Sequence, residues 1–282
     1  MAVSKLKPKV KDEEESSGRL EEALTSEVSP SDEAEDEVYT LPAGYVDGNG
    51  TTHTEFTIRD IIGKDEEAIH KADVKANGSK VVSTLLTRCV TRIGTLTPKS
   101  VGGSDKWANI IKSLLVGDQD YMLVQLRKKS IGDEIEANHI CPNPSCKAKL
   151  TTFLSLDELE FVPFDGERVI PFALTRGYKD RKGVVHKEGT LRLPTGLDRE
   201  ILTPLAKSNL AKAETTMLTR VCKFNDGAYV DDDVMSNLTI KDREYLMKLL
   251  REHLFGYKFE VEVTCSSCGE TFKGSLNAAN FI

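Results

Sequence analysis

The sequence predicts an α+β fold built as a tandem duplication, in which a β-hairpin, several helices and a cysteine hairpin occur twice. Two alignments within the chain support this prediction. Residues 44–67 align without a gap on residues 177–200. Residues 118–141 run in register with residues 242–265, and each of these segments ends at a cysteine. The alternating runs and helical periods inside each copy predict that strands and helices belong to one repeated unit.

Charge is distributed unevenly along the 282 residues. Residues 1–38 carry 5 Lys or Arg against 12 Asp or Glu, so the net charge of −7 lies there and residues 39–282 are neutral. Residues 1–38 also lack a sustained apolar period and cannot bury enough surface to offset their ordering entropy, which predicts a disordered acidic tail. A neutral body argues against a nucleic-acid-binding surface, because phosphate contacts need a local excess of basic side chains.

The apolar content of the chain, 39%, is sufficient for a sizeable core. No run is long and apolar enough to suggest a transmembrane helix, and the N-terminus lacks the apolar segment of a signal peptide. We therefore expect synthesis in a reducing cytoplasm. In that compartment, paired cysteines are more often metal ligands than disulfides.

The first repeat is predicted over residues 39–161. A turn rich in Gly, Asp and Asn at 47–50 precedes an alternating run at 52–59, which indicates a β-hairpin. Asp65 is expected to cap the helix that follows, because acidic residues in a first turn suit the helix dipole. Helical spacing is found over 80–93, 106–115 and 119–129, and a cysteine hairpin at 132–161 closes the repeat.

A linker is predicted over 162–169 and the second repeat over 170–282, with its cysteine hairpin at 256–282. Several polar residues recur in both copies. For the histidines we expect cross-strand packing or hydrogen bonding. For the arginines and aspartates two interpretations stay open, an active charged pair or an arginine that fixes the hairpin against the helix start. The recurring residues are His53 and His186, Arg59 and Arg192, and Asp65 and Asp198.

Four cysteines carry the strongest chemical signal. Cys141 and Cys146 are separated by four residues, Cys265 and Cys268 by two, and each pair lies at a tight turn between strand-like runs. Each hairpin supplies two thiolates, whereas a structural zinc ion takes four ligands. The two hairpins are therefore expected to pair as a zinc ribbon that shares one Zn²⁺.

Four thiolates leave no open coordination position, so this zinc would be structural. No catalytic residue and no other cofactor site is predicted, because the sequence contains no phosphate-binding loop, dinucleotide fingerprint or pair of catalytic carboxylates. Cys89 and Cys222 are expected to be small buried core residues.

Two segments carry a resemblance to a known family. The segment LPAGYVDGNGTTHTEFTIRDIIGKDEEAI resembles the opening signature of phage tail-assembly and T4-type base-plate proteins. The segment LLVGDQDYMLVQLRKKSIGDEIEANHICPNPSC, followed by a second cysteine pair, is similar to the longer members that carry a zinc ribbon. The resemblance covers residues 40–282. It implies a non-enzymatic role in building the base-plate hub of contractile-tailed phages and related contractile injection systems.

The resemblance implies a function based on protein–protein binding. The expected partners are other base-plate hub, tail-tube or tape-measure proteins, with neither nucleic acid nor membrane among them, and oligomerisation within the base plate stays open. The expected location is the virion tail base plate, after synthesis in the bacterial host cytoplasm. Two alternatives stay open: a transient tail-assembly chaperone that is absent from the finished particle, and a nucleic-acid-binding zinc-ribbon protein.

Overall fold

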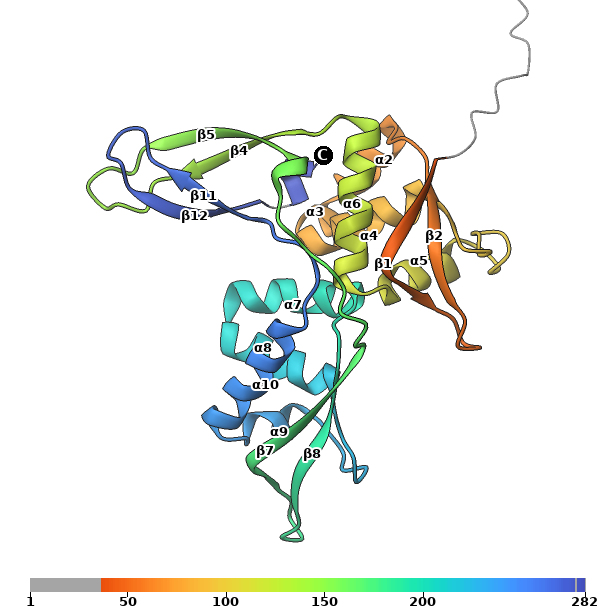
Figure 1. The fold of residues 1–282 in the computed structure, drawn as a ribbon, viewed down its shortest axis with the longest axis vertical. Coiled ribbons are helices and arrows are strands. Elements are labelled where there is room, and N and C mark those ends of the chain that lie inside the picture. The colour runs from red at the N-terminus through yellow and green to blue at the C-terminus, as the bar shows by residue number, and fades with distance from the viewer. Residues whose placement is uncertain (1–36, 277, 282) are drawn as a thin grey trace, which may run out of the picture. The chain divides into compact units, whose positions relative to one another are not determined.

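The computed structural model describes residues 37–276 and 278–281. The predicted acidic tail lies outside the described residues as far as Asp36, whereas Val38 already belongs to the first strand. In the described part, both halves of the chain mix helices and strands, as expected for an α+β fold (Figure 1).

Each half contains a three-stranded antiparallel sheet, in which a hairpin is extended by a short third strand. The strand order is β1-β2-β3 in the first half and β7-β8-β9 in the second. The first strand of each hairpin is irregular near the turn, between Thr40 and Tyr45 and between Ala173 and Tyr178. The strands are β1 (Val38–Val46), β2 (Thr52–Ile58), β3 (Val90–Ile93), β7 (Val169–Lys179), β8 (Val185–Arg192) and β9 (Cys222–Phe224).

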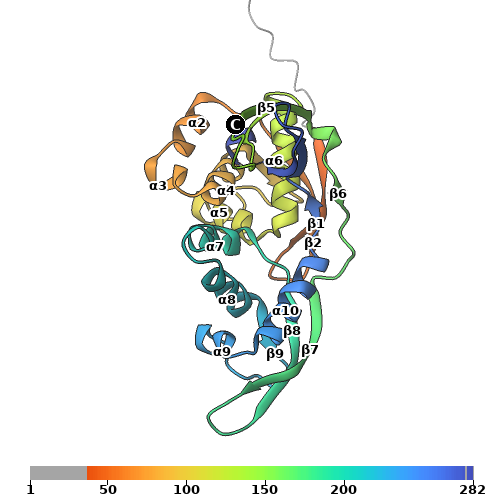
Figure 2. The ribbon, with the colours of Figure 1, turned by 90° about the vertical axis from the view of Figure 1, so that its left-hand side faces the viewer.

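Helices follow each hairpin in the chain. The first half contains α2 (Gly63–Ile69), α3 (Ala72–Lys75), α4 (Gly78–Cys89), α5 (Ser104–Ser113) and α6 (Val116–Ser130). The second half contains α7 (Gly196–Ser208), α8 (Leu210–Val221), α9 (Asp232–Ser236) and α10 (Ile240–Glu252). Figure 2 shows α7, α8 and α9 on one side of β7 and β8.

The helix expected over 80–93 ends earlier than the apolar period suggests. It is α4 up to Cys89, and Val90–Ile93 form β3, which pairs with β2. Val90, Thr91 and Ile93 are β-branched, and such side chains favour an extended backbone when a partner strand is available. The apolar stripe therefore continues into the core, but on a strand.

A buried aspartate at the start of α2 joins the hairpin to the helices. The sequence predicted Asp65 as the N-cap of α2, and this prediction is wrong by three residues. The N-cap is Ile62, and Asp65 lies in the first turn, where it accepts a hydrogen bond from the backbone N–H of Ile62. Arg59 donates to both of its oxygens at 2.7 and 2.9 Å, and Arg88 from α4 donates at 2.7 Å. These hydrogen bonds, above all those from Arg59, hold the pKa of Asp65 well below its usual range.

The second half contains the same arrangement. Asp198 at the start of α7 accepts hydrogen bonds from Arg192 at 2.6 and 3.0 Å and from Arg220 of α8 at 2.5 Å. Both pairs join a hairpin to a helix start, as the structural interpretation of the repeated arginine and aspartate expects. The third member of each set, Arg88 or Arg220, was not predicted, although it recurs in both copies.

A second buried aspartate in each half binds the irregular part of the hairpin. Asp118 of α6 accepts hydrogen bonds from the amides of Ala43 and Gly44, at 2.9 and 3.4 Å, and Asp242 of α10 accepts one from Gly177 at 3.1 Å. Gly44 and Gly177 have φ angles of 82° and 76°. A Cβ at Gly44 would lie 2.9 Å from the His53 carbonyl, so both the backbone angle and the space require glycine.

The two halves meet along α7. The backbone N–H of Gly196 donates to the Leu114 carbonyl at 3.0 Å, and the hydroxyls of Thr203 and Ser79 lie 2.6 Å apart. Arg199 forms an ion pair with Asp120 of α6, whose pKa is raised chiefly by burial. The halves are thus fastened by hydrogen bonds and an ion pair at α7, independently of the cysteines.

The C-terminal segment contributes to the core of the first half. Leu276 and Phe281 are buried in the same apolar cluster as Phe56 and Trp107. The chain therefore crosses back to the first half after α10, and its second cysteine hairpin lies beside the first one. The connecting elements are η1 (Leu156–Glu158), β6 (Phe161–Val162), β10 (Gly256–Tyr257), which pairs with β6, and η2 (Ala278–Phe281).

Asp118 should make the stability of the protein depend on pH. Burial raises its pKa from the ordinary 3.8 to about 6, against the opposing effect of the two amides. The folded state thus binds more protons than the unfolded state between about pH 4 and 6, so this group lowers stability as pH rises through that window, by on the order of 3 kcal/mol. Asp118→Asn keeps an acceptor for the amides and removes the charge, so the decline should become smaller by this contribution, while the part due to other buried carboxyls such as Asp120 stays.

Urea unfolding at a series of pH values measures this dependence. Asp73→Asn is the matched control, because Asp73 is exposed and its change should leave the decline in place. The same pH slope in wild type and Asp118→Asn would contradict the assignment.

Candidate metal centre

The first cysteine hairpin is formed by β4 (Glu134–Ile140) and β5 (Lys149–Ser155), which pair without interruption up to the turn. The backbone N–H of Cys141 donates to Ala148 at 2.9 Å and closes the hairpin. Within the turn, the Asn143 carbonyl accepts from the amides of Cys146 and Lys147 at 3.0 and 3.1 Å. These bonds point both sulfur-bearing residues to the same side of the turn.

The second hairpin is formed by β11 (Glu260–Thr264) and β12 (Thr271–Ser275). The backbone N–H of Cys265 donates to Glu270 at 2.8 Å, and that of Gly269 donates to Cys265 at 2.9 Å. Gly269, directly after the second cysteine, has a φ of 76°, and Lys147 at the corresponding place of the first hairpin has a φ of 49°. In both turns, therefore, the residue after the second cysteine has a left-handed backbone conformation, which glycine adopts without steric cost.

The two hairpins lie side by side, as Figure 1 shows. Ile135, Ala137 and His139 on β4 are buried, while Phe153 on β5 is 73% exposed. The His139 ring fills the space over Gly274, where a Cβ would lie 2.5 Å from its Cε1, and it meets the Phe272 ring edge-on at 6.4 Å between centroids. The missing side chain at Gly274 thus sets how closely the hairpins approach.

The four cysteines converge where the two turns meet. All four sulfurs lie within 4.8 Å of one another. The Sγ of Cys141 is 3.7 Å from that of Cys268, and the Sγ of Cys146 is 3.8 Å from that of Cys265. A disulfide would bring two sulfurs to about 2.05 Å. Four ligands around a metal with a metal–sulfur distance of about 2.3 Å would stand about 3.8 Å apart.

Burial and backbone amides give the sulfurs unequal surroundings. Cys141 and Cys265 are buried, Cys146 is half-buried and Cys268 is exposed. Burial opposes ionisation of Cys265, yet the amides of Ser267 and Cys268 stabilise its thiolate and lower its pKa to about 7. Burial raises the pKa of Cys141 and so disfavours its thiolate. Four neighbouring thiolates would therefore need a cation to balance their negative charge.

This donor set fits a metal ion with a preference for sulfur. The cluster offers four sulfur ligands for the corners of a tetrahedron, which suits Zn²⁺ and other thiophilic ions and leaves no position for a substrate or water. Among the His, Cys, Asp and Glu side chains in the part of the chain that the structure describes, these four cysteines form the group close enough together to hold an ion. The structure brings together all four cysteines singled out in the sequence.

The two other cysteines and the two recurring histidines lie away from the cysteine cluster and contact neighbouring residues of the fold. Cys89 and Cys222 are buried in the cores of the two halves, as predicted. His53 lies 3.2 Å from a carboxylate oxygen of Asp47 in the hairpin turn, and His186 lies 2.6 Å from one of Asp226. The expected hydrogen bonding is found for both histidines, within the hairpin for His53 and to the segment after β9 for His186.

Two residues that shape the site were not singled out in the sequence, His139 and Gly274. Gly274 interrupts an alternating strand, which is the usual sign of a close approach by another group. His139 follows the same alternation of buried and exposed residues as its neighbours on β4, so nothing in the sequence marked it as a contact residue. Its contact depends on a hairpin more than a hundred residues away in the chain, so the local pattern could not reveal it.

Gly274→Ala should disturb the packing of the two hairpins. The added Cβ would meet the His139 ring, and overpacking of this kind costs about 1–3 kcal/mol. Gly48→Ala is the matched control, because nothing lies within 4 Å of a Cβ there. Urea unfolding should show the loss for Gly274→Ala alone, and adding His139→Ala should recover part of it. Equal stability of the two alanine variants would contradict the packing argument.

No helix in the described residues is long and apolar enough to cross a membrane. No curated protein matches the chain, and no solved structure does. The family described as T4 bacteriophage base plate protein matches residues 45–182 and 187–281, which include both cysteine hairpins, the helices α2 to α10 and all four clustered cysteines. The chain therefore belongs to the family of T4 bacteriophage base plate proteins.

Proposed function

We propose that the chain is a non-enzymatic structural or assembly component of the base-plate hub of a contractile phage tail, acting by protein–protein binding. The observation that carries this proposal is the family match across both halves of the chain. The proposed partners are other hub, tail-tube or tape-measure proteins. The proposed location is the tail base plate, after synthesis in the host cytoplasm.

One structural Zn²⁺, bound by Cys141, Cys146, Cys265 and Cys268, is part of the proposal. The sulfur separations of 3.7 and 3.8 Å agree with a tetrahedral site for an ion of this size. Four sulfur ligands leave no open position, which favours a structural role over a catalytic one. Two-stranded hairpins are marginally stable by themselves, and such elements gain most from a bound ion.

A tandem duplication explains why the two hairpins each supply half of the site. The proposed units are an acidic tail at 1–38, a first repeat at 39–161, a linker at 162–169 and a second repeat at 170–282. Both halves have the same strand order, the same buried aspartate bound to a hairpin glycine, and the same aspartate held by two arginines. Shared details of this kind support descent from one unit.

The recurring polar residues support a role without chemistry. Both histidines, and both sets of arginine and aspartate, are engaged in contacts that hold hairpins and helices together. A rigid body with two such hairpins is suited to present surfaces to other proteins. The transient chaperone and the nucleic-acid-binding zinc ribbon are the alternatives to be tested.

Metal analysis tests the zinc site. Wild-type protein should carry about one zinc per chain, and Cys265→Ser should lose it together with much of its thermal stability, because metal binding and folding are coupled. Cys222→Ala is the control, since Cys222 lies in the core of the second half and should leave the metal content unchanged. Two ions per chain, or none in the wild type, would contradict one shared site.

A phage lacking this gene tests the role in the base plate. Its tails should fail to complete a base plate, a wild-type copy should restore assembly, and mass spectrometry of purified tails should detect the protein. Its absence from finished tails that need it for assembly would favour the chaperone. Normal base plates without the gene would contradict the proposal, and retention on DNA at moderate salt would favour the nucleic-acid alternative.

A further inference from the structure

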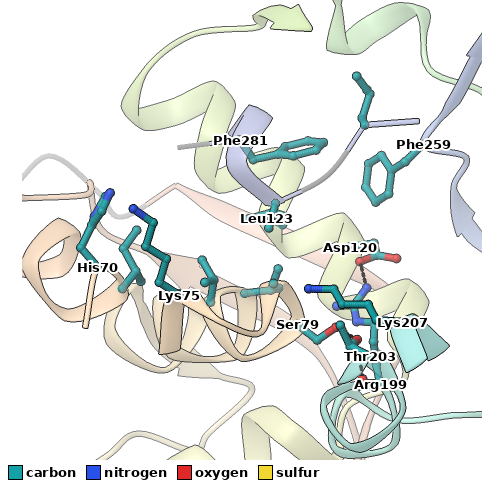
Figure 3. A pocket seen from close by; sticks show the side chains of 16 residues that line it. His70, Lys75, Ser79, Asp120, Leu123, Arg199, Thr203, Lys207, Phe259 and Phe281 are labelled. Atoms are coloured by element: carbon teal, nitrogen blue, oxygen red, sulfur yellow. Dashed lines mark hydrogen bonds and ion pairs between the residues drawn. The ribbon is translucent and has the colours of Figure 1, made fainter. Parts of the chain in front are cut away.

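A groove with a volume of about 690 Å³ lies between three segments that are distant in sequence. One side is formed by the start of α4 and the preceding α3, the opposite side by α7, and the top by the C-terminal segment that ends in η2. Figure 3 shows the side chains that line it. Its size falls in the range of sites that bind ligands of drug size, about 300–1,000 Å³.

The middle of the groove is apolar. Leu123 of α6 and Phe281 of η2 lie there in Figure 3, with Phe259 beside them. Val82 of α4 adds a further apolar side chain. These residues belong to the core of the first half or pack against it, so the groove is an opening onto that core.

The two ends of the groove carry positive charge. Lys75 lies at one end and Lys207 at the other in Figure 3, with the apolar residues between them. Arg199 and Asp120 also line the groove but balance each other in an ion pair. Among the described residues, neither lysine forms a salt bridge or a side-chain hydrogen bond, although most charges near them are paired.

The corresponding place in the second half has a different character. There α8 and α10 border a groove of about 530 Å³. In the alignment of the two copies, Glu214 stands where the first groove has Val82, and Met247 stands for Leu123. Glu214 and Glu244 both line this second groove. Lys212, Arg243 and Arg251 line it as well, so acidic and basic side chains are mixed there. In the first groove, by contrast, two lysines without an ion-pair partner among the described residues flank an apolar middle.

We propose that the first groove binds a peptide segment of a partner protein, in which bulky apolar side chains are flanked on both sides by Asp or Glu. The apolar anchors would enter above Leu123 and Phe281, and the flanking carboxylates would pair with Lys75 and Lys207. A single-headed amphiphile such as a fatty acid offers only one anionic end, whereas the cations stand at both. This inference rests on the proposed function, because it names the kind of tail-protein segment that the chain would hold.

Selection of displayed random 16-residue peptides on the full, metal-loaded chain tests the inference. Enriched peptides should combine Phe, Leu, Ile or Trp with Asp or Glu on both sides. The double variant Lys75→Glu/Lys207→Glu should weaken their binding by about tenfold or more, because charge reversal opposes the flanking carboxylates. Lys99→Glu/Lys182→Glu makes the same change of charge at two exposed lysines outside the groove, and should leave binding unchanged.

Four outcomes would overturn the inference. Enriched peptides could lack acidic residues, or bind the groove variant as tightly as the wild type. Laurate could displace them at equimolar concentration, which would assign the groove to a small amphiphile. Removal of residues 1–36 could raise the affinity of the peptides more than tenfold, which would indicate that a segment of the chain itself competes for the groove.

The result is separable from that of the proposed function. In the phage that lacks this gene, the groove variant should bind zinc as the wild type does and fail to restore base-plate assembly. Full assembly with the variant, in a phage that needs the gene, would contradict the groove inference but not the role in the base plate. A phage that assembles without the gene would instead contradict the proposed function.

Discussion

The convergence of four sulfurs at the meeting point of two hairpins is the constraint on which the arrangement of these hairpins depends. A two-stranded hairpin is marginally stable by itself in water. Each hairpin here buries side chains on one face, and the His139 ring over Gly274 fixes their approach. Four sulfurs within 4.8 Å would repel one another as thiolates, and a cation bound between them would replace this repulsion with attraction.

The hairpins are not the only connection between the halves. Hydrogen bonds from α7 and the ion pair between Arg199 and Asp120 join them as well, and the C-terminal Phe281 is buried in the first core. The two sets of contacts act on different parts of the chain. Those of α7 and the C-terminal segment hold the second half against the first, whereas the cysteine cluster holds the two hairpins against each other. The same packing creates the groove, since α7 and the C-terminal segment form two of its sides.

Local patterns in the sequence predicted the elements that depend on neighbouring residues. The hairpin turns and the pairing of cysteines within each turn follow from spacing and turn chemistry. The convergence of the cysteines was predictable because the repeat supplied long-range information. The end of α4 was not, since β3 forms only when β2 offers a partner. Contacts such as His139 with Gly274, or the two lysines at the ends of the groove, join residues that no local pattern relates.

X-ray absorption at the zinc edge, on full-length protein purified without added metal, tests the central claim most directly. The account predicts one zinc per chain with four sulfur neighbours at about 2.3 Å and no nitrogen or oxygen ligand. A first shell that contains oxygen or nitrogen, or a sulfur count well below four, would contradict a single ion held by both hairpins.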